Sequence, residues 1–192
     1  GYDAGAGVLT RGKTVTKRLL GWVAGTPGEA GCYGSVGQTG DPEHLAGTGR
    51  DETGGILMVH LINPWGTSWQ RRVNEDNIDL NRNYLDYSRP APHNAAYEEL
   101  HPLFTRECAT SEARAQSEAQ WQALEKQLGA TELKSKLEAG QYRHPDGLYF
   151  GGFAPAWSNL TLSAIMQEHL ADCTDDISVD LHTGEGAYGP PM

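Results

Sequence analysis

Apolar and polar positions along this chain predict a few strands separated by longer helical stretches. Residues 56 to 62 form a continuous apolar run closed by Asn63 and Pro64, which is typical of a strand covered on both faces. This run is expected to be a central parallel strand. Residues 177 to 181 predict a further strand, and residues 14 to 25 predict a strand or a helix followed by a turn.

Helical spacing dominates the middle of the chain. Residues 94 to 104 and 111 to 128 predict two helices, and a third is expected to start with a cap at Ser158 or Asn159 and to run to about residue 171. Residues 140 to 157 are rich in Gly, Pro and aromatic side chains and predict a long loop. The order of elements predicts an α/β fold with a mostly parallel mixed sheet flanked by helices, which binds its ligand at the carboxyl ends of the strands.

Glycine is concentrated at the start of the chain. Residues 1 to 55 hold 15 of the 24 glycines. Glycine at this density costs backbone entropy that few apolar side chains offset. The sequence therefore predicts a glycine-rich segment over residues 1–55 and a partial α/β domain over residues 56–192.

Composition narrows the possible partners. The 192 residues carry a formal net charge of −10, which argues against nucleic acid and against an anionic membrane surface as partners. The three cysteines are far apart and no run approaches the length of a membrane span, so a reduced, cytoplasmic location is expected. Because the chain begins with Gly1, we expect a processed or truncated polypeptide.

Polar residues beside the central apolar run suggest an anion receptor. Arg71, Arg72, Asn81 and Arg82 lie within residues 63 to 84. A guanidinium donates two parallel hydrogen bonds to a carboxylate, and an Asn amide adds a neutral donor. The expected partner is a small anionic substrate. The alternative is that these arginines form surface ion pairs with nearby acidic residues.

Five short blocks extend this pattern. They read NEDNIDLNRN (74–83), SRP (88–90), HPDGLYFGG (144–152), WSN (157–159) and DLHTG (180–184). The chain resembles the zinc carboxypeptidase family at Asn63-Pro64, at Arg72-Val73-Asn74, over DLNRNY (79–84) and over VDLHTGEGAYG (179–189). The five blocks, in this order, resemble most an uncharacterised, mainly bacterial branch of that clan, related to aspartoacylase and succinylglutamate desuccinylase. The resemblance covers roughly residues 56 to 189.

The resemblance implies a zinc-dependent hydrolase that cleaves an amide next to a free carboxylate. His182 matches the last zinc-ligand histidine of the family, and Arg72 matches the arginine that polarises the scissile carbonyl. Asn81 and Arg82 match the pair that grips the substrate's terminal carboxylate. Asp79 matches an acid that orients a zinc-bound histidine through its other ring nitrogen.

The loop around HPDGLYFGG is expected beside this site. Tyr142 or Tyr149 there is expected either to donate a hydrogen bond to a substrate carbonyl or to serve aromatic packing. His144 is singled out by its place in this loop. Four further histidines are scattered, and a surface or hydrogen-bonded role is expected for each of them: His60, His93, His101 and His169.

The chain also departs from the family. No H-x-x-E zinc box precedes residue 60, and residues 24 to 31 carry Pro27 and Ala30 where histidine and glutamate are expected. No glutamate follows His182 at the distance of the family's general base. Zinc is therefore expected from the resemblance but is expected to bind weakly, or not at all, to this chain. Two alternatives stay open, an aspartoacylase-like N-acyl amino acid deacylase and a non-catalytic domain that keeps a carboxylate-binding Arg-Asn clamp.

Overall fold

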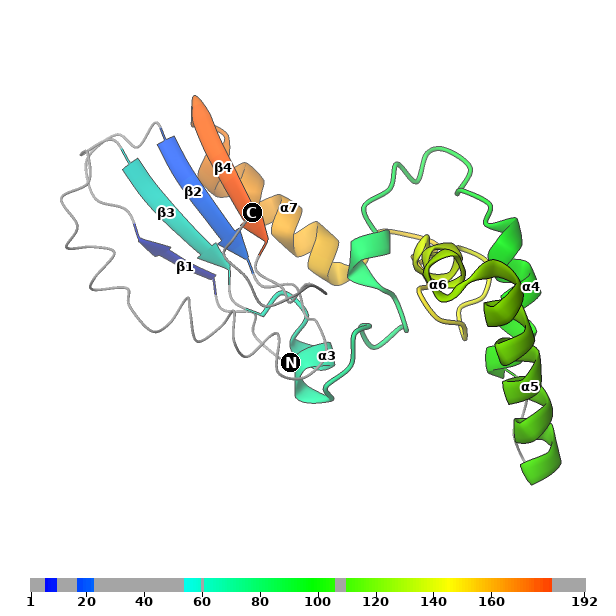
Figure 1. Ribbon diagram of the computed structural model, residues 1–192. Coiled ribbons are helices and arrows are strands. Elements are labelled where there is room, and N and C mark those ends of the chain that lie inside the picture. Colours follow the sequence, from blue (N-terminus) through cyan, green and yellow to red (C-terminus); the bar gives the residue numbers. More distant parts are fainter. Residues whose placement is uncertain (1–5, 10–16, 23–53, 60, 106–109, 181–192) are drawn as a thin grey trace. The chain divides into compact units, whose positions relative to one another are not determined.

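The computed structural model describes residues 6–9, 17–22, 54–59, 61–105 and 110–180 (Figure 1). The chain divides into two compact units. We call Gly1–Asn74 with Leu160–Met192 the sheet unit, and Glu75–Asn159 the helical unit.

The sheet unit contains a four-stranded mixed sheet in the order β1-β3-β2-β4. β3 pairs in parallel with β2 and antiparallel with β1, and β2 pairs in parallel with β4. In this register, Leu19 of β2 lies opposite Ile56 of β3 and Ile177 of β4. The strands are β1 (Ala6–Leu9), β2 (Lys17–Trp22), β3 (Gly54–Val59) and β4 (Asp175–Asp180).

The apolar run that predicted a central strand becomes β3, which occupies an interior position of the sheet. Leu57 and Val59 are buried there. The strand ends earlier than the apolar pattern does, because the chain turns at Asn63 into the short helix α3 (Pro64–Ser68). The Asn63 Oδ1 accepts a hydrogen bond from the Gly66 amide at 3.0 Å, and proline at the first helical position has a φ angle already suited to a helix.

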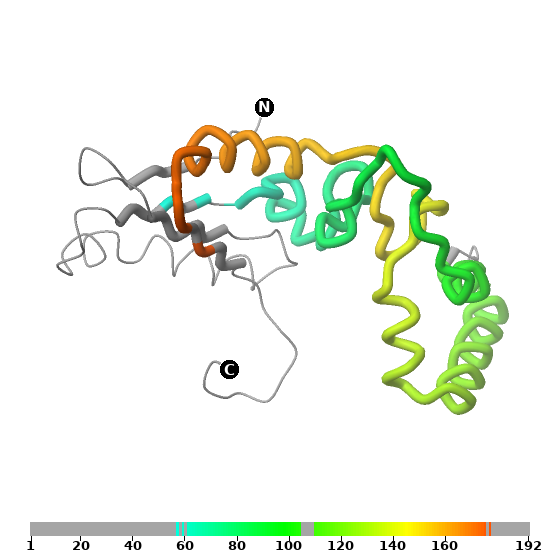
Figure 2. Tube along the Cα trace, turned by 90° about the horizontal axis from the view of Figure 1, so that it is seen from above, coloured from blue at the N-terminus to red at the C-terminus, as the bar shows by residue number. Residues whose placement is uncertain are grey.

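Three helices build most of the helical unit. The helices predicted over residues 94 to 104 and 111 to 128 are present as α4 (Ala95–Thr105) and α5 (Ser111–Leu128). Figure 2 shows α5 lying side by side with α6 (Ala130–Glu138), and Gly129, at a φ of 84°, makes the turn between them. α6 was not among the predicted elements, although Leu133 and Leu137 are spaced as on one face of a helix.

The third predicted helix is α7 (Trp157–Leu170), which begins one residue before the predicted cap at Ser158. Leu162 is buried, as expected for a residue on its core-facing side. Residues 14 to 25 were predicted to contain either a strand or a helix, and the structure shows the strand β2 there.

The long loop predicted before α7 contains a closed loop, which we define as residues 141–150. Its ends meet in a bridge between Gln141 and Phe150, and the Gly151 amide donates to the Gln141 carbonyl oxygen at 2.8 Å. The Gln141 side chain is also buried, and its Oε1 accepts from the backbone amides of Arg143 at 2.9 Å and His144 at 2.8 Å. The Gln141 side-chain amide thus satisfies backbone N–H groups of the loop, which in a sheet would be satisfied by a neighbouring strand.

Asn83 ties the segment before α4 to the residues after the closed loop. Its side chain is 0% exposed, so each of its polar atoms needs a partner. The Nδ2 donates to the carbonyl oxygens of Gly151 at 2.8 Å and Ala154 at 3.0 Å. The Oδ1 accepts from the Ala156 amide at 2.7 Å, and the Asn159 side chain donates to the Asn83 carbonyl oxygen at 2.9 Å.

The assignment of the whole chain to a zinc-carboxypeptidase-like α/β fold stays a prediction. The strands are described, but the connections over residues 10–16 and 23–53 and the segment 181–192 lie outside the described residues. The predicted boundary after residue 55 stays a prediction for the same reason. No helix in the described part of the chain is both long and apolar enough to cross a membrane.

Replacing Asn83 by Asp should destabilise the fold far more than the same change at Asn81. The Asn83→Asp side chain would turn a donor into a charged acceptor facing the Gly151 and Ala154 carbonyl oxygens, at a cost of at least about 3 kcal/mol of unfolding free energy. Asn81 is exposed, so Asn81→Asp should change stability by less than about 0.5 kcal/mol. Urea unfolding followed by circular dichroism measures both, and equal losses would contradict the buried network.

Candidate functional site

The segment Asp79–Asn83 combines three buried residues with two more accessible polar ones. Leu80–Arg82 forms the single 3-10 turn η1, and Asp79 caps it through its Oδ1, which accepts from the Asn81 amide at 3.0 Å. Asp79 is buried, and its own amide donates to the Phe150 carbonyl oxygen at 2.7 Å. Asn81 is exposed and Arg82 partly exposed. The hydrogen bonds of buried Asp79 therefore fix the backbone of the turn that carries Asn81 and Arg82.

The Arg82 side chain is held at the carboxyl end of α6. Its Nε donates to the Glu138 carbonyl oxygen at 2.8 Å, and its Nη2 donates to the same oxygen. That carbonyl belongs to the last turn of the helix, where backbone oxygens lack helical partners and attract cations. Gly140, at a φ of 83°, leaves room for this contact, since a Cβ there would lie 2.8 Å from the Arg82 Cδ.

Tyr149 lies against the same guanidinium. The Arg82 Cζ is 5.7 Å from the centroid of the Tyr149 ring, and the Tyr149 hydroxyl donates to Glu138 Oε1 at 3.4 Å. Tyr149 adopts a φ of 52°, which is uncommon for a residue with a side chain. The Tyr142 hydroxyl donates to the Arg82 backbone carbonyl oxygen at 2.8 Å. Both tyrosines therefore contact Arg82, and the predicted hydrogen bond from one of them to a substrate carbonyl stays a prediction.

This arrangement is suited to binding an anion at a fixed place. A guanidinium carries five N–H donors, and the contacts with Glu138 use only Nε and Nη2. The Tyr149 ring and the Glu138 carbonyl oxygen restrict the rotation of the Arg82 side chain, so less entropy is lost when a ligand binds. Asn81 precedes Arg82 on the same turn, and its exposed side chain carries a neutral N–H donor.

The structure does not place the remaining predicted site residues relative to this group. Arg72 is partly buried and belongs to the sheet unit. His182, the predicted zinc ligand, lies outside the described residues, as do Pro27 and Ala30. The convergence of Arg72, Arg82 and His182 on one cleft stays a prediction, and so does the predicted role of Asp79 behind a zinc-bound histidine.

Sequence reasoning missed one constellation. Among the described residues, His101, His144 and Asp146 bring one possible metal-ligand atom each to within 4.8 Å of the others. His144 and Asp146 are two positions apart in the closed loop, whereas His101 comes from α4. No spacing rule connects these positions, so only the placement of the loop on α4 reveals the group.

Comparison with known families identifies the family to which this chain belongs. The chain matches, over residues 7–192, the family described as "Protein of unknown function (DUF2817)". The chain belongs to this DUF2817 family. The family is associated with the zinc-carboxypeptidase-like superfamily, in agreement with the motif blocks at the coarse level. Neither the curated proteins nor the solved structures gave a significant match.

Alkaline titration should report the packing of three tyrosines in this DUF2817 domain. Burial raises the pKa of Tyr87 and Tyr142, and it raises the pKa of Tyr97 to about 12. Because the fold favours the protonated phenols, their contribution to stability is present below pH 10 and is lost as the pH rises towards 12. Absorbance at 295 nm should show fewer ionised tyrosines in the native chain than in urea at about pH 10.5. Superimposable titrations would contradict this packing.

Proposed function

We propose that this DUF2817 domain is a zinc-dependent hydrolase of the carboxypeptidase type, which cleaves an amide next to a free carboxylate. The observation that carries the proposal is the restrained Arg82 guanidinium, which stands beside Asn81 on a turn capped by buried Asp79. Membership in a family associated with the zinc-carboxypeptidase-like superfamily supports the same reaction class.

In this proposal Arg82 and Asn81 bind the substrate's carboxylate. The two contacts with Glu138 leave the guanidinium further N–H donors for an anion, and the Asn81 amide fixes the anion's orientation. Arg72 polarises the carbonyl of the amide that is cleaved, and His182 contributes to holding the zinc ion. Zinc, when bound, lowers the pKa of a water molecule to about 7 and thereby supplies the nucleophile.

Two neighbouring functions share the carboxylate site and differ elsewhere. An N-acyl amino acid deacylase of the aspartoacylase type would take the same anion and cleave an acyl group from it. A non-catalytic domain would bind the anion and release it unchanged, which is favoured by the missing H-x-x-E box before residue 60. Carboxylate binding is therefore common to all three, and product formation distinguishes them.

Arg82→Lys should weaken the binding of a small carboxylate, such as an N-acetylated amino acid, more than Arg71→Lys does. An ammonium keeps the charge but loses the forked geometry, and one charge-assisted hydrogen bond contributes about 1.5–3 kcal/mol. This corresponds to at least about a tenfold rise in Kd, measured by isothermal titration calorimetry. Asn81→Asp should weaken binding as well, because it adds a negative charge without changing the contacts between Arg82 and Glu138.

Equal losses for Arg82→Lys and Arg71→Lys would mean a nonspecific basic surface and would contradict the site. A matched ligand with its carboxylate amidated should not bind. Incubation of the chain and zinc with peptides and with N-acyl amino acids then separates the three functions by product analysis. Cleavage that requires a free carboxylate and is lost in His182→Ala supports the hydrolase, whereas binding without cleavage supports the non-catalytic alternative.

A further inference from the structure

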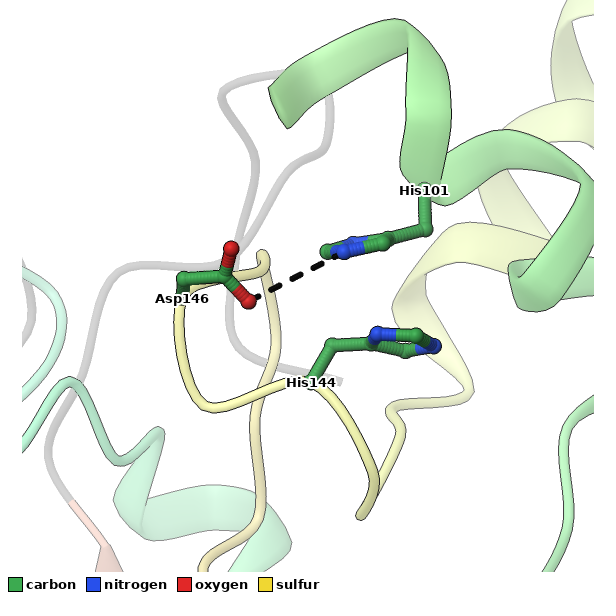
Figure 3. A group of neighbouring side chains, drawn as sticks. All are labelled: His101, His144 and Asp146. Carbon is green, nitrogen blue, oxygen red and sulfur yellow. Dashed lines mark ion pairs between the residues drawn. The ribbon is translucent and has the colours of Figure 1, made fainter. Parts of the chain in front are cut away.

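A second candidate site lies in the helical unit, where the closed loop meets α4. Figure 3 shows His101 of α4 above His144, with Asp146 beside them. The two imidazole rings are stacked with centroids 3.7 Å apart, and the His101 Nε2 lies 3.8 Å from Asp146 Oδ1. The possible ligand atoms of the three residues all lie within 4.8 Å of one another.

The backbone that carries His144 and Asp146 is fixed before any ligand arrives. Gln141 accepts from the His144 amide through Oε1 and donates to the His144 carbonyl oxygen at 2.7 Å through Nε2. Asn77 donates through Nδ2 to the Pro145 carbonyl oxygen at 2.8 Å and to the Gly147 carbonyl oxygen at 2.9 Å. Both neighbours of Asp146 and the backbone of His144 are thus held by side-chain amides.

The loop is also pressed against α4. A Cβ at Gly147 would lie 2.5 Å from the Tyr97 hydroxyl and 3.0 Å from the His101 Nδ1. Only glycine permits this approach without displacing α4 side chains. The close packing sets the distance between His101 and the two loop residues.

A fourth residue orients His144. Glu98 lies one helical turn before His101 on α4, and its Oε2 is 2.8 Å from the His144 Nε2. With Nε2 protonated and donating to Glu98, the lone pair of the neutral ring is on Nδ1. Histidines that bind metals characteristically donate their other ring N–H to a carboxylate in this way.

We propose that His101, His144 and Asp146 form a binding site for a divalent transition-metal ion of the zinc, cobalt or nickel class, with Glu98 positioning His144. Two imidazoles and one carboxylate suit these ions. None of its three ligand residues is the predicted ligand His182, and its ion would fasten the closed loop to α4.

Binding an ion requires a definite rearrangement of the side chains. Metal–nitrogen bonds of about 2.0–2.1 Å draw ligand atoms to about 3.3 Å from one another in a tetrahedral site. The rings, now inclined by 26°, must therefore tilt apart, and Asp146, whose side chain is 68% exposed, must swing inward. The backbone already stands in place, so the movement is confined to the side chains.

The test is a titration of the untagged, chelator-treated 192-residue chain with cobalt(II), followed by visible absorption, with zinc competition for affinity. This site should bind one ion per chain with the absorption of a tetrahedral site, in addition to any ion held at His182. Asp146→Ala changes an exposed side chain and should fold normally, and it should weaken binding at least about tenfold. His101→Gln should do the same. The exposed-acid control Asp172→Ala should bind as the parent does, and His182→Ala should keep the ion of this site.

Asp146→Ala binding cobalt(II) as tightly as Asp172→Ala would overturn the proposal, as would loss of the ion in His182→Ala alone. Imidazole ¹H–¹⁵N spectra test the orientation directly. Zinc should shift the His144 Nδ1 resonance while Nε2 stays protonated, and Glu98→Gln should weaken binding by about tenfold with the protein still folded. A zinc-induced shift at Nε2 instead would overturn the role of Glu98.

Discussion

The buried amide of Asn83 is the interaction on which the helical unit depends. Residues 83, 151, 154, 156 and 159 share no helix or strand, yet all of them meet at one side chain. A buried amide without partners would cost about 1–3 kcal/mol, so this site accepts only one orientation of the surrounding backbone. Gln141 and Asn77 act on the closed loop in the same manner. Hydrogen bonds from these side chains therefore determine the conformation of the irregular backbone, as strand pairing does in a sheet.

This network explains why residues of the motif D-L-N-R-N differ in role. Asp79 and Asn83 are buried and bind backbone, whereas Asn81 is exposed and Arg82 is partly exposed. The buried residues determine where the accessible residues lie. Arg82 also has a structural contact with Glu138, so packing at the end of α6 accounts for an arginine here even apart from the proposed anion.

Periodic elements were predictable from the sequence, and the individual contacts were not. α4, α5 and β3 follow repeated patterns in which many side chains contribute, so the loss or gain of one residue changes little. The closed loop has no period. Its shape depends on single atoms such as the Gln141 Oε1, and no residue spacing identifies the carbonyl or amide that such an atom will meet.

The same reasoning explains which site residues could be found. Asn81 and Arg82 were found because a short motif carries them together, whereas His101 was not linked to His144 because 42 positions of α5, α6 and their connections lie between them. The sequence did single out the loop that contains His144, but it did not indicate that Glu98 would stand against that histidine.

Both candidate sites use the closed loop, at different points of its backbone. Tyr149 contacts Arg82 near one end, and His144 contacts Glu98 near the other. Gln141 joins these points, because its backbone amide donates to the Tyr149 carbonyl oxygen at 3.1 Å while its side chain holds His144. A change in the loop backbone at His144 must therefore alter the bonds of Gln141, and through them the support of Tyr149. The geometry of the proposed anion site and that of the proposed metal site consequently both depend on the buried Gln141 and its hydrogen bonds.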